Sequence, residues 1–236
     1  MQFDVRSNVM QVKRFLDEAQ QKQLPFATVL AMTLTAKDVK EHEKTVMQRV
    51  FDRPTPYALN ALQVKPATKR TMQATVEFKE GFNGTPAKRF LNPEVNGGPR
   101  SQKSSEKSLA SRLKTASYYA PGRAMALNSY GNLSGSAVKK ILSQLGASSN
   151  ADSNATNSKR SKRKRKTQAF FIPKKGGMVL ERKGEALSVA LVGIRSPHYR
   201  KRFPFYEEAA KVVEDRMPVN FEVAFQKAMA TARAPR

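Results

Sequence analysis

The sequence predicts an α+β fold, in which an antiparallel or mixed sheet is packed by helices from the N- and C-terminal ends of the chain. Apolar residues recur at helical spacing in residues 9–51 and again in residues 204–232. Between them, residues 72–79 alternate apolar with polar side chains, and residues 168–194 hold three short strand-like runs. We therefore expect a hairpin near residues 57–79 and a meander over residues 168–194 in one sheet, within a single domain of residues 1–236 that carries long irregular insertions.

The N-terminal part of the chain is predicted to be mainly helical. A first helix begins after Ser7 or Asn8, and a second begins at Pro25, because proline suits the first turn of a helix. The second helix ends near Phe51, before a proline-rich turn. After the strand of residues 72–79, residues 81–84 match the GxxG loop of KH domains in letters, but they follow a strand, so we interpret them as a plain turn.

Residues 81–158 are predicted as an inserted region of helices and loops. One helix begins at Ser104 or Ser105, and a second, compact helix is capped by Ser134. Between them lies an irregular stretch, residues 118–132, whose aromatic side chains either anchor the loop to the core or stack on bases. Residues 147–166 are predicted as a flexible loop, polar in its first part and basic in its second.

The C-terminal part is predicted as three strands followed by two helices. The strands cover residues 168–172, 178–182 and 187–194, with glycine-containing turns between them. The helices cover residues 204–217 and 219–232, because Pro218 is expected to break a continuous helix.

Positive charge is concentrated in the middle of the chain. The net charge is +24, and residues 81–202 hold 25 Lys and Arg against five Asp and Glu. The peak is KRSKRKRK at residues 159–166, and a second cluster, YRKRF, lies at residues 199–203. Such charge indicates a surface that faces a polyanion. The residues predicted to contact nucleic acid or an acidic partner are Lys159, Arg160, Lys162, Arg163, Lys164, Arg165, Lys166, Arg200, Lys201 and Arg202.

The sequence lacks the usual signatures of catalysis. It has no cysteine, its two histidines are 156 positions apart, and it contains no phosphate-binding glycine loop and no nucleophile elbow. A nuclease site would need several carboxylates around Mg²⁺, and the basic region holds few. We therefore expect a protein that is not an enzyme and has no cofactor or metal. No apolar run is long enough to span a bilayer, so a soluble protein without a membrane partner is expected.

Four segments resemble proteins encoded beside the tail genes of tailed bacteriophages. These segments are Arg53-Pro54-Thr55-Pro56-Tyr57, Val64-Lys65-Pro66-Ala67-Thr68, Gly97-Gly98-Pro99-Arg100, and residues 199–206, YRKRFPFY. The chain is similar to the tail-completion or minor tail protein Z group. That resemblance implies an α+β subunit of a homo-oligomeric ring in the virion tail or at the head–tail junction, assembled in the bacterial host cytoplasm. It also implies other copies of the chain, portal or other neck and tail proteins, and genome DNA as partners.

A ring subunit needs two interfaces on opposite flanks, and aromatic and arginine side chains are the usual anchors of such interfaces. The candidates are Phe203, Phe205, Tyr206, Arg53 and Tyr57. For the aromatic residues of the segment 203–206, a place in the intramolecular core is an equal alternative. Two other functions stay open: non-specific binding of DNA or RNA with the basic run as an arm, and nuclear localisation, against which the bacteriophage resemblance argues.

Overall fold

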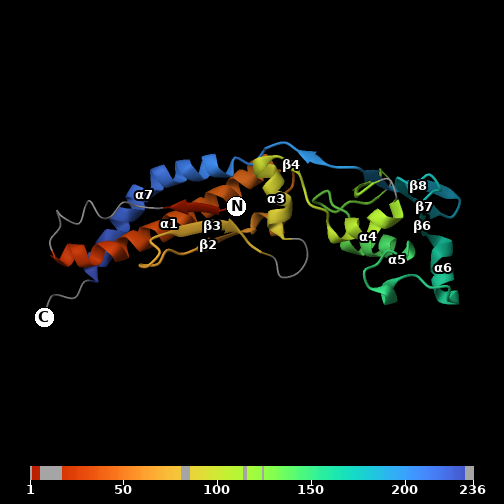
Figure 1. Ribbon diagram of the computed structural model, residues 1–236, viewed down its shortest axis with the longest axis horizontal. Helices are drawn as coiled ribbons and strands as arrows, with labels where there is room; N and C mark the ends of the chain where they lie inside the picture. The colour runs from red at the N-terminus through yellow and green to blue at the C-terminus, as the bar shows by residue number, and fades with distance from the viewer. Residues whose placement is uncertain (1, 6–17, 81–85, 114–115, 124, 232–236) are drawn as a thin grey trace. The chain divides into compact units, whose positions relative to one another are not determined.

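The structure, a computed structural model, describes residues 2–5, 18–80, 86–113, 116–123 and 125–231, with side chains from residue 23 onward. The chain divides into two compact units. The first unit combines residues 1–96 with residues 201–236, and the second consists of residues 97–200. In Figure 1 the first unit is coloured red to yellow and dark blue, and the second runs from yellow-green to cyan-blue.

In the first unit, two long helices pack along each other and against a small sheet (Figure 1). The helices are α1 (Glu18–Val50) and α7 (Phe205–Ala230), and the sheet has the order β1-β3-β2. Its antiparallel strands are β1 (Gln2–Val5), β2 (Leu62–Lys65) and β3 (Ala74–Phe78). The short helix α2 (Pro56–Leu59) and helix α3 (Ala87–Asn96) complete the unit.

The alternation along β3 separates its two faces. Val76 and Phe78 are buried in the core between the sheet and the helices. On the other face, Glu77 lies 2.6 Å from the ammonium of Lys65 and accepts a hydrogen bond from the Gln63 amide at 2.7 Å. One apolar and one polar face is the arrangement expected of an antiparallel sheet that is covered on one side.

The second unit has its own sheet and its own hydrophobic core. The sheet is antiparallel, with the order β5-β8-β7-β6. Its strands are β5 (Tyr118–Pro121), β6 (Ala169–Phe171), β7 (Met178–Lys183) and β8 (Ala186–Ile194). A two-residue ribbon pairs β4 (Gly98–Pro99) with β9 (His198–Tyr199). The helices are α4 (Ser104–Leu113), α5 (Gly135–Gln144) and α6 (Lys159–Thr167), with a 3-10 turn, η3, at Ala151–Ser153.

The α+β class is confirmed, and so are most of the predicted elements. The helices at Ser104 and after Ser134 are present, and the Ser134 hydroxyl accepts a hydrogen bond from the Ala137 amide at 3.2 Å. The three strands predicted within residues 168–194 correspond to β6, β7 and β8. The helix predicted after Ser7 or Asn8 and the turn at residues 81–84 lie outside the described residues.

Three predicted boundaries are wrong, two of them because helix packing overrides the local signal of a proline. Helix α1 begins before Pro25, at Glu18, and α7 continues through Pro218, since each helix packs along the length of the other. The strand predicted from Met72 begins instead at Ala74, and Met72 lies in a turn with a positive φ of 47°.

The predicted arrangement of the strands is also wrong. Strands β6, β7 and β8 do not extend the sheet of β3, but join β5, which comes from the stretch predicted to be irregular. Tyr119 is paired with Gly193 there, and a Cβ at position 193 would stand 2.5 Å from the carbonyl oxygen of Gly177. The single-domain prediction is not tested by the division into two units and stays a prediction.

Candidate nucleic-acid interface

The basic run forms a helix, α6, rather than the predicted loop. Ser158 caps its first turn, with its hydroxyl 3.3 Å from the amide nitrogen of Ser161. Lysine and arginine are good helix formers once their charges are screened, which explains how so polar a segment becomes helical. Gln168 then turns the chain into the extended conformation and directly into β6.

The polar tract before α6 is bonded to α5. The hydroxyl of Ser143 donates to the carbonyl oxygen of Ser153 at 2.5 Å, and the Ala155 amide donates to the carbonyl of Ser143 at 2.9 Å. Inside the tract, the Asn154 side-chain oxygen accepts from the amide of Ser148 at 2.9 Å. These bonds hold the segment before α6 against the body of the second unit.

The cations of α6 are displayed to solvent without acidic partners. Six of the seven are exposed, and the seventh, Arg165, is half-buried and donates to the carbonyl oxygen of Thr156 at 3.0 Å. Within the described residues, none of the seven forms an ion pair with a carboxylate. The surrounding unit does not neutralise them either, because residues 97–200 carry 21 Lys and Arg against four Asp and Glu.

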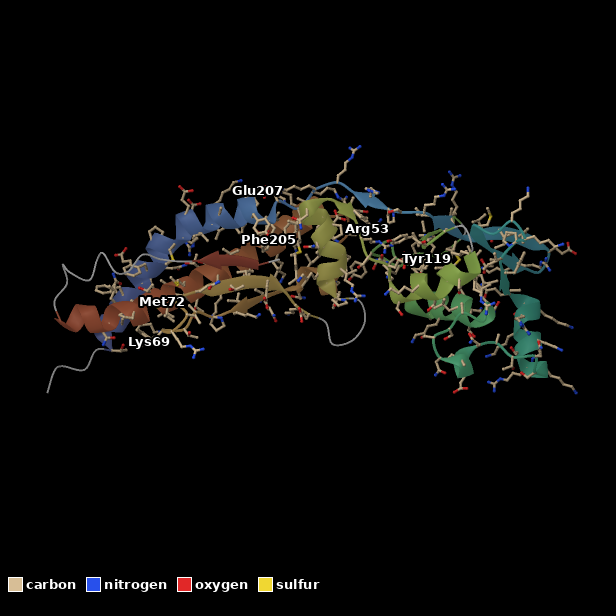
Figure 2. All side chains as sticks on the ribbon, viewed as in Figure 1. Arg53, Lys69, Met72, Tyr119, Phe205 and Glu207 are labelled. Carbon is tan, nitrogen blue, oxygen red and sulfur yellow. The ribbon has the colours of Figure 1, made fainter. Side chains whose placement is uncertain are left out.

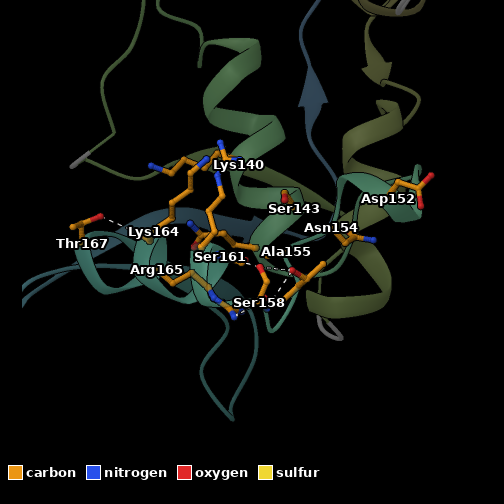
Figure 3. A pocket seen from close by; sticks show the side chains of 13 residues that line it. Lys140, Ser143, Asp152, Asn154, Ala155, Ser158, Ser161, Lys164, Arg165 and Thr167 are labelled. Carbon is orange, nitrogen blue, oxygen red and sulfur yellow. Dashed lines mark hydrogen bonds between the residues drawn. The ribbon is translucent and has the colours of Figure 1, made fainter.

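Helical periodicity sorts these cations into two faces. Positions spaced by three and four residues lie on one side of a helix. Four cations of α6 have this spacing, and we call them the outer stripe: Lys159, Lys162, Arg163 and Lys166. The remaining cations, Arg160, Lys164 and Arg165, line a groove between α6, the polar tract and α5 (Figure 3).

The groove is strongly cationic. Its volume is about 790 Å³, and Lys140 of α5 adds a fourth cation to the three from α6. Asp152 is the one carboxylate among the residues that line it, and Figure 3 places Asp152 at the far end of the groove from Lys164. The other polar groups of the lining are hydroxyls and amides: Ser143, Gln144, Asn154, Thr156, Ser158, Ser161 and Thr167.

The second predicted basic cluster is only partly available. Arg200 is exposed in the second unit, but Lys201 and Arg202 belong to the first unit. The Lys201 ammonium lies 2.5 Å from the carboxylate of Glu207. Arg202 forms a bidentate ion pair with Glu94, in which both hydrogen bonds are 2.9 Å long. The structure therefore assigns Arg202 a role in holding the first unit together, and it does not bring Lys201 and Arg202 into one unit with α6.

The predicted interface residues divide in a similar way. Phe203 and Phe205 are completely buried in the core of the first unit, with ring centroids 5.7 Å apart, as the intramolecular alternative expects. Phe205 is labelled in Figure 2. Tyr57 and Tyr206 are exposed over 51% and 40% of their surface. Arg53 is exposed and pairs with its neighbour Asp52 at 3.0 Å.

Sequence reasoning missed a buried ion pair in the second unit. Glu106 is 1% exposed, and both of its oxygens accept from Arg100, at 2.5 and 2.7 Å. The hydrogen bonds from Arg100 to Glu106 hold the pKa of that guanidinium above its ordinary value, and Arg100 also donates to the Tyr199 hydroxyl at 3.1 Å. The sequence singles out the motif Gly97-Gly98-Pro99-Arg100 only for its resemblance to bacteriophage proteins, and the motif gives no signal of this ion pair.

A second missed residue is the buried carboxyl group of Glu43 in α1. It is completely buried, and neither of its oxygens has a hydrogen-bond partner among the described residues. Burial, and after it the negative charges of Glu208 and Glu207, raises the pKa of Glu43 to about 8. Its sequence neighbours Glu41 and Lys44 are charged, so the local sequence gives no signal that Glu43 is buried.

In the part of the chain that the structure describes, there is no group of three or more His, Cys, Asp and Glu that could hold a metal ion. Among the described helices, none is long and apolar enough to cross a membrane. No family model, curated protein or solved structure matches the chain.

Proposed function

We propose that the chain is a structural, non-catalytic protein that binds double-stranded DNA through α6, and that it serves as a ring subunit in the tail or at the head–tail junction of a tailed bacteriophage. The observation that carries the DNA-binding part is the outer stripe, whose four cations are exposed and have no carboxylate partner among the described residues. Lys and Arg side chains that neutralise DNA phosphates release the counterions condensed on the DNA, and this release favours binding.

The length of the outer stripe supports a linear polyanion as the ligand. Lys159 and Lys166 are seven residues apart, which is roughly 10 Å along a helix at 1.5 Å per residue. Double-stranded DNA carries one phosphate charge for about every 1.7 Å of its axis, so several phosphates lie within the reach of the stripe. No base-reading residue follows from this pattern, so the binding is expected to be independent of DNA sequence.

The test measures the affinity of the full chain for a fluorescent DNA duplex over a range of salt concentrations. Replacement of all four stripe residues by Gln is expected to flatten the slope of log K against log salt by roughly 3 to 4, at about 0.9 for each phosphate that the variant no longer neutralises. A matched variant that removes the same charge elsewhere in the second unit, at Lys107, Lys174, Lys175 and Arg195, is the control, since all four are exposed and none lies on α6. Equal slopes for the wild type and the stripe variant would overturn the DNA-binding proposal.

The virion setting rests on a different observation, the four segments that resemble proteins encoded beside bacteriophage tail genes. A ring subunit is expected to use exposed aromatic side chains at its contacts, and Tyr57 and Tyr206 meet that condition. Electron microscopy of the purified protein should reveal closed rings, and Tyr57→Ala together with Tyr206→Ala should shift the population toward monomers. A chain that is monomeric both in isolation and in virus particles would contradict this setting and leave the DNA-binding part intact.

A further inference from the structure

We propose that the groove between α5 and α6 is a phosphate-binding site, in which Lys140, Arg160 and Lys164 hold a backbone phosphate of the DNA that the outer stripe binds. The inference rests on the proposed DNA binding and extends it in two ways. It assigns a contact to Lys140, which lies outside the basic run, and it places a second line of contacts on the opposite side of α6.

The groove draws its charge from two elements that are separate in the sequence. Lys140 comes from α5, whereas Arg160 and Lys164 come from α6. In Figure 3 the side chain of Lys164 extends from α6 toward α5, where Lys140 lies. Cations of like charge repel one another unless an anion lies between them, so the arrangement is best satisfied with an anionic group in the groove.

A chain of hydrogen bonds positions Lys140 at the wall of the groove. Its ammonium donates to the side-chain oxygen of Gln168, and the amide nitrogen of Gln168 donates to Glu181. Glu181 is 2% exposed and belongs to β7, so this series of hydrogen bonds starts from a buried side chain of the second unit. An ammonium has three N–H donors, and this bond uses one of them, which leaves two to donate to a ligand.

Most hydroxyl groups of the groove already donate hydrogen bonds to protein oxygens, so the cations decide which class of ligand can bind. The hydroxyls of Ser143, Thr156 and Thr167 donate to neighbouring protein oxygens, at 2.5, 3.0 and 2.9 Å. The charged ends of Lys140, Arg160 and Lys164 thus supply most of the recognition. A group with several negatively charged oxygens fits these donors, and a phosphate has them.

The outer stripe and the groove cannot contact the same row of phosphates. An α-helix with its side chains is about 10 to 12 Å thick, and the two sets of cations lie on different faces of α6. The major groove of DNA is about 12 Å wide, so phosphates of the two strands stand on either side of a helix that lies there. The groove therefore adds contacts to those of the stripe.

The experiment compares three forms of the full chain: wild type, Lys140→Gln with Lys164→Gln, and a control with Lys174→Gln and Lys175→Gln. Binding of a DNA duplex is measured against salt concentration, and lysine acetylation is mapped by mass spectrometry with no ligand, with the duplex and with inorganic phosphate. We expect the groove variant to flatten the slope of log K against log salt by about 0.9, for the one phosphate that it no longer holds, and the control variant to leave it unchanged. We also expect the duplex to protect Lys140 and Lys164 from acetylation in the wild type, and to leave Lys174 and Lys175 reactive.

The outcomes separate this inference from the proposed function. Protection by inorganic phosphate but not by the duplex would support the site and identify a free phosphate as its ligand. Protection by neither, in a protein whose DNA binding still depends on the outer stripe, would overturn the groove and leave the proposed function standing. If the wild type does not bind the duplex, the proposed function fails, and the phosphate-protection measurement alone then decides whether the groove binds an anion.

Discussion

At the scale of single residues, Glu43 has the least favourable surroundings of the described carboxyl groups. It is completely buried with no hydrogen-bond partner among the described residues, and Glu207 and Glu208 add negative charge nearby. His42 is the sequence neighbour of Glu43, but its Nε2 atom forms a hydrogen bond with Oε2 of Glu208, at 2.8 Å, instead of with Glu43. Glu43 is therefore held in the neutral form at neutral pH, and its ionisation is coupled to the stability of the first unit.

The sign of that coupling predicts a loss of stability as pH rises. The pKa of Glu43 is raised from 4.5 to about 8 in the folded protein. Between these values the folded state keeps a proton that the unfolded state releases, so the free energy of unfolding falls by about 1.4 kcal/mol per pH unit. The change begins near pH 4.5 and ends above pH 8.

Glu43→Met removes the ionisable group with little change of volume, and at pH 8 it should raise the free energy of unfolding by about 4 kcal/mol relative to wild type, which is the loss that the titration of Glu43 causes up to that pH. Urea unfolding, followed by the helical circular dichroism signal at pH 5 and pH 8, measures the difference between the two proteins. Glu41→Gln is the control, because Glu41 is exposed on the same helix. If Glu43→Met is less stable than wild type at pH 8, the ionised carboxylate must have a stabilising partner.

Residue environments of this kind could not be predicted from the sequence. The side of α1 on which Glu43 lies is decided by α7, which follows about 160 positions later. The pairs Arg202–Glu94 and Arg100–Glu106 depend on the same kind of long- or medium-range contact. The burial of Phe203 and Phe205 was one of two alternatives, and only their packing in the core decides between them.

At the scale of elements, α6 is a helix that its own positive charges destabilise. Seven pairs of its cations lie three or four residues apart, and each such like-charge pair costs a helix about 0.2 to 0.5 kcal/mol, or together roughly 1 to 4 kcal/mol. Its first turn contains no acidic residue, so Lys159 and Arg160 also face the positive end of the helix dipole. Anions should therefore stabilise α6 more than any other helix of the second unit.

We expect hydrogen exchange of the backbone amides of residues 162–167 to slow when sulfate or a DNA duplex is added, by roughly tenfold for each 1.4 kcal/mol gained. Amide exchange measured by mass spectrometry, with and without the anion, tests this expectation. Helix α4, which contributes no residue to the groove and carries a much lower charge, serves as the internal reference and should change little. Unchanged exchange in α6 at saturating duplex would show that the helix does not bind the anion.

The comparison of elements shows what local patterns can predict. Ser134 and the alternating strands were found because a cap and a period of two are local signals. The helical state of residues 159–167 was missed because its charge was interpreted as a sign of a loop, although Ser158 and seven good helix formers favour a helix. Continuity through Pro218 depends on α1 and has no local signal.

At the scale of the whole molecule, hydrogen bonds hold together the chain ends of each unit where the polypeptide passes from one unit to the other. In the first unit, the amides of Arg202 and Phe203 both donate to the carbonyl oxygen of Glu94, at 2.8 and 2.9 Å. In the second unit, Gly98 pairs with Tyr199, and Arg100 donates to the hydroxyl of Tyr199. The pairing of strands across the two units, which the strand pattern of the sequence predicted, would have required one continuous sheet instead.

The pairing of Gly98 with Tyr199 at the two ends of the second unit predicts that residues 97–200 fold without the rest of the chain. The segment has its own core, formed by residues such as Leu109, Ile141, Phe170 and Leu191, and its two ends are already paired. A domain is expected to have a core of its own and boundaries that few contacts cross. The isolated segment should unfold in one cooperative thermal transition and keep the salt-dependent DNA binding of the full chain.

The complementary protein joins residue 96 to residue 201 through a short glycine–serine linker. It should also fold, because Glu94 and Arg202 already hold the two segments together, and it should not bind the duplex. Glu106→Gln in the isolated segment tests whether its transition reports the native fold, since it removes the charge of the buried Glu106 that pairs with Arg100 and should lower the transition temperature. If neither part folds while the full chain does, the chain is a single domain, as its sequence predicts, and the division describes two regions of one cooperative structure.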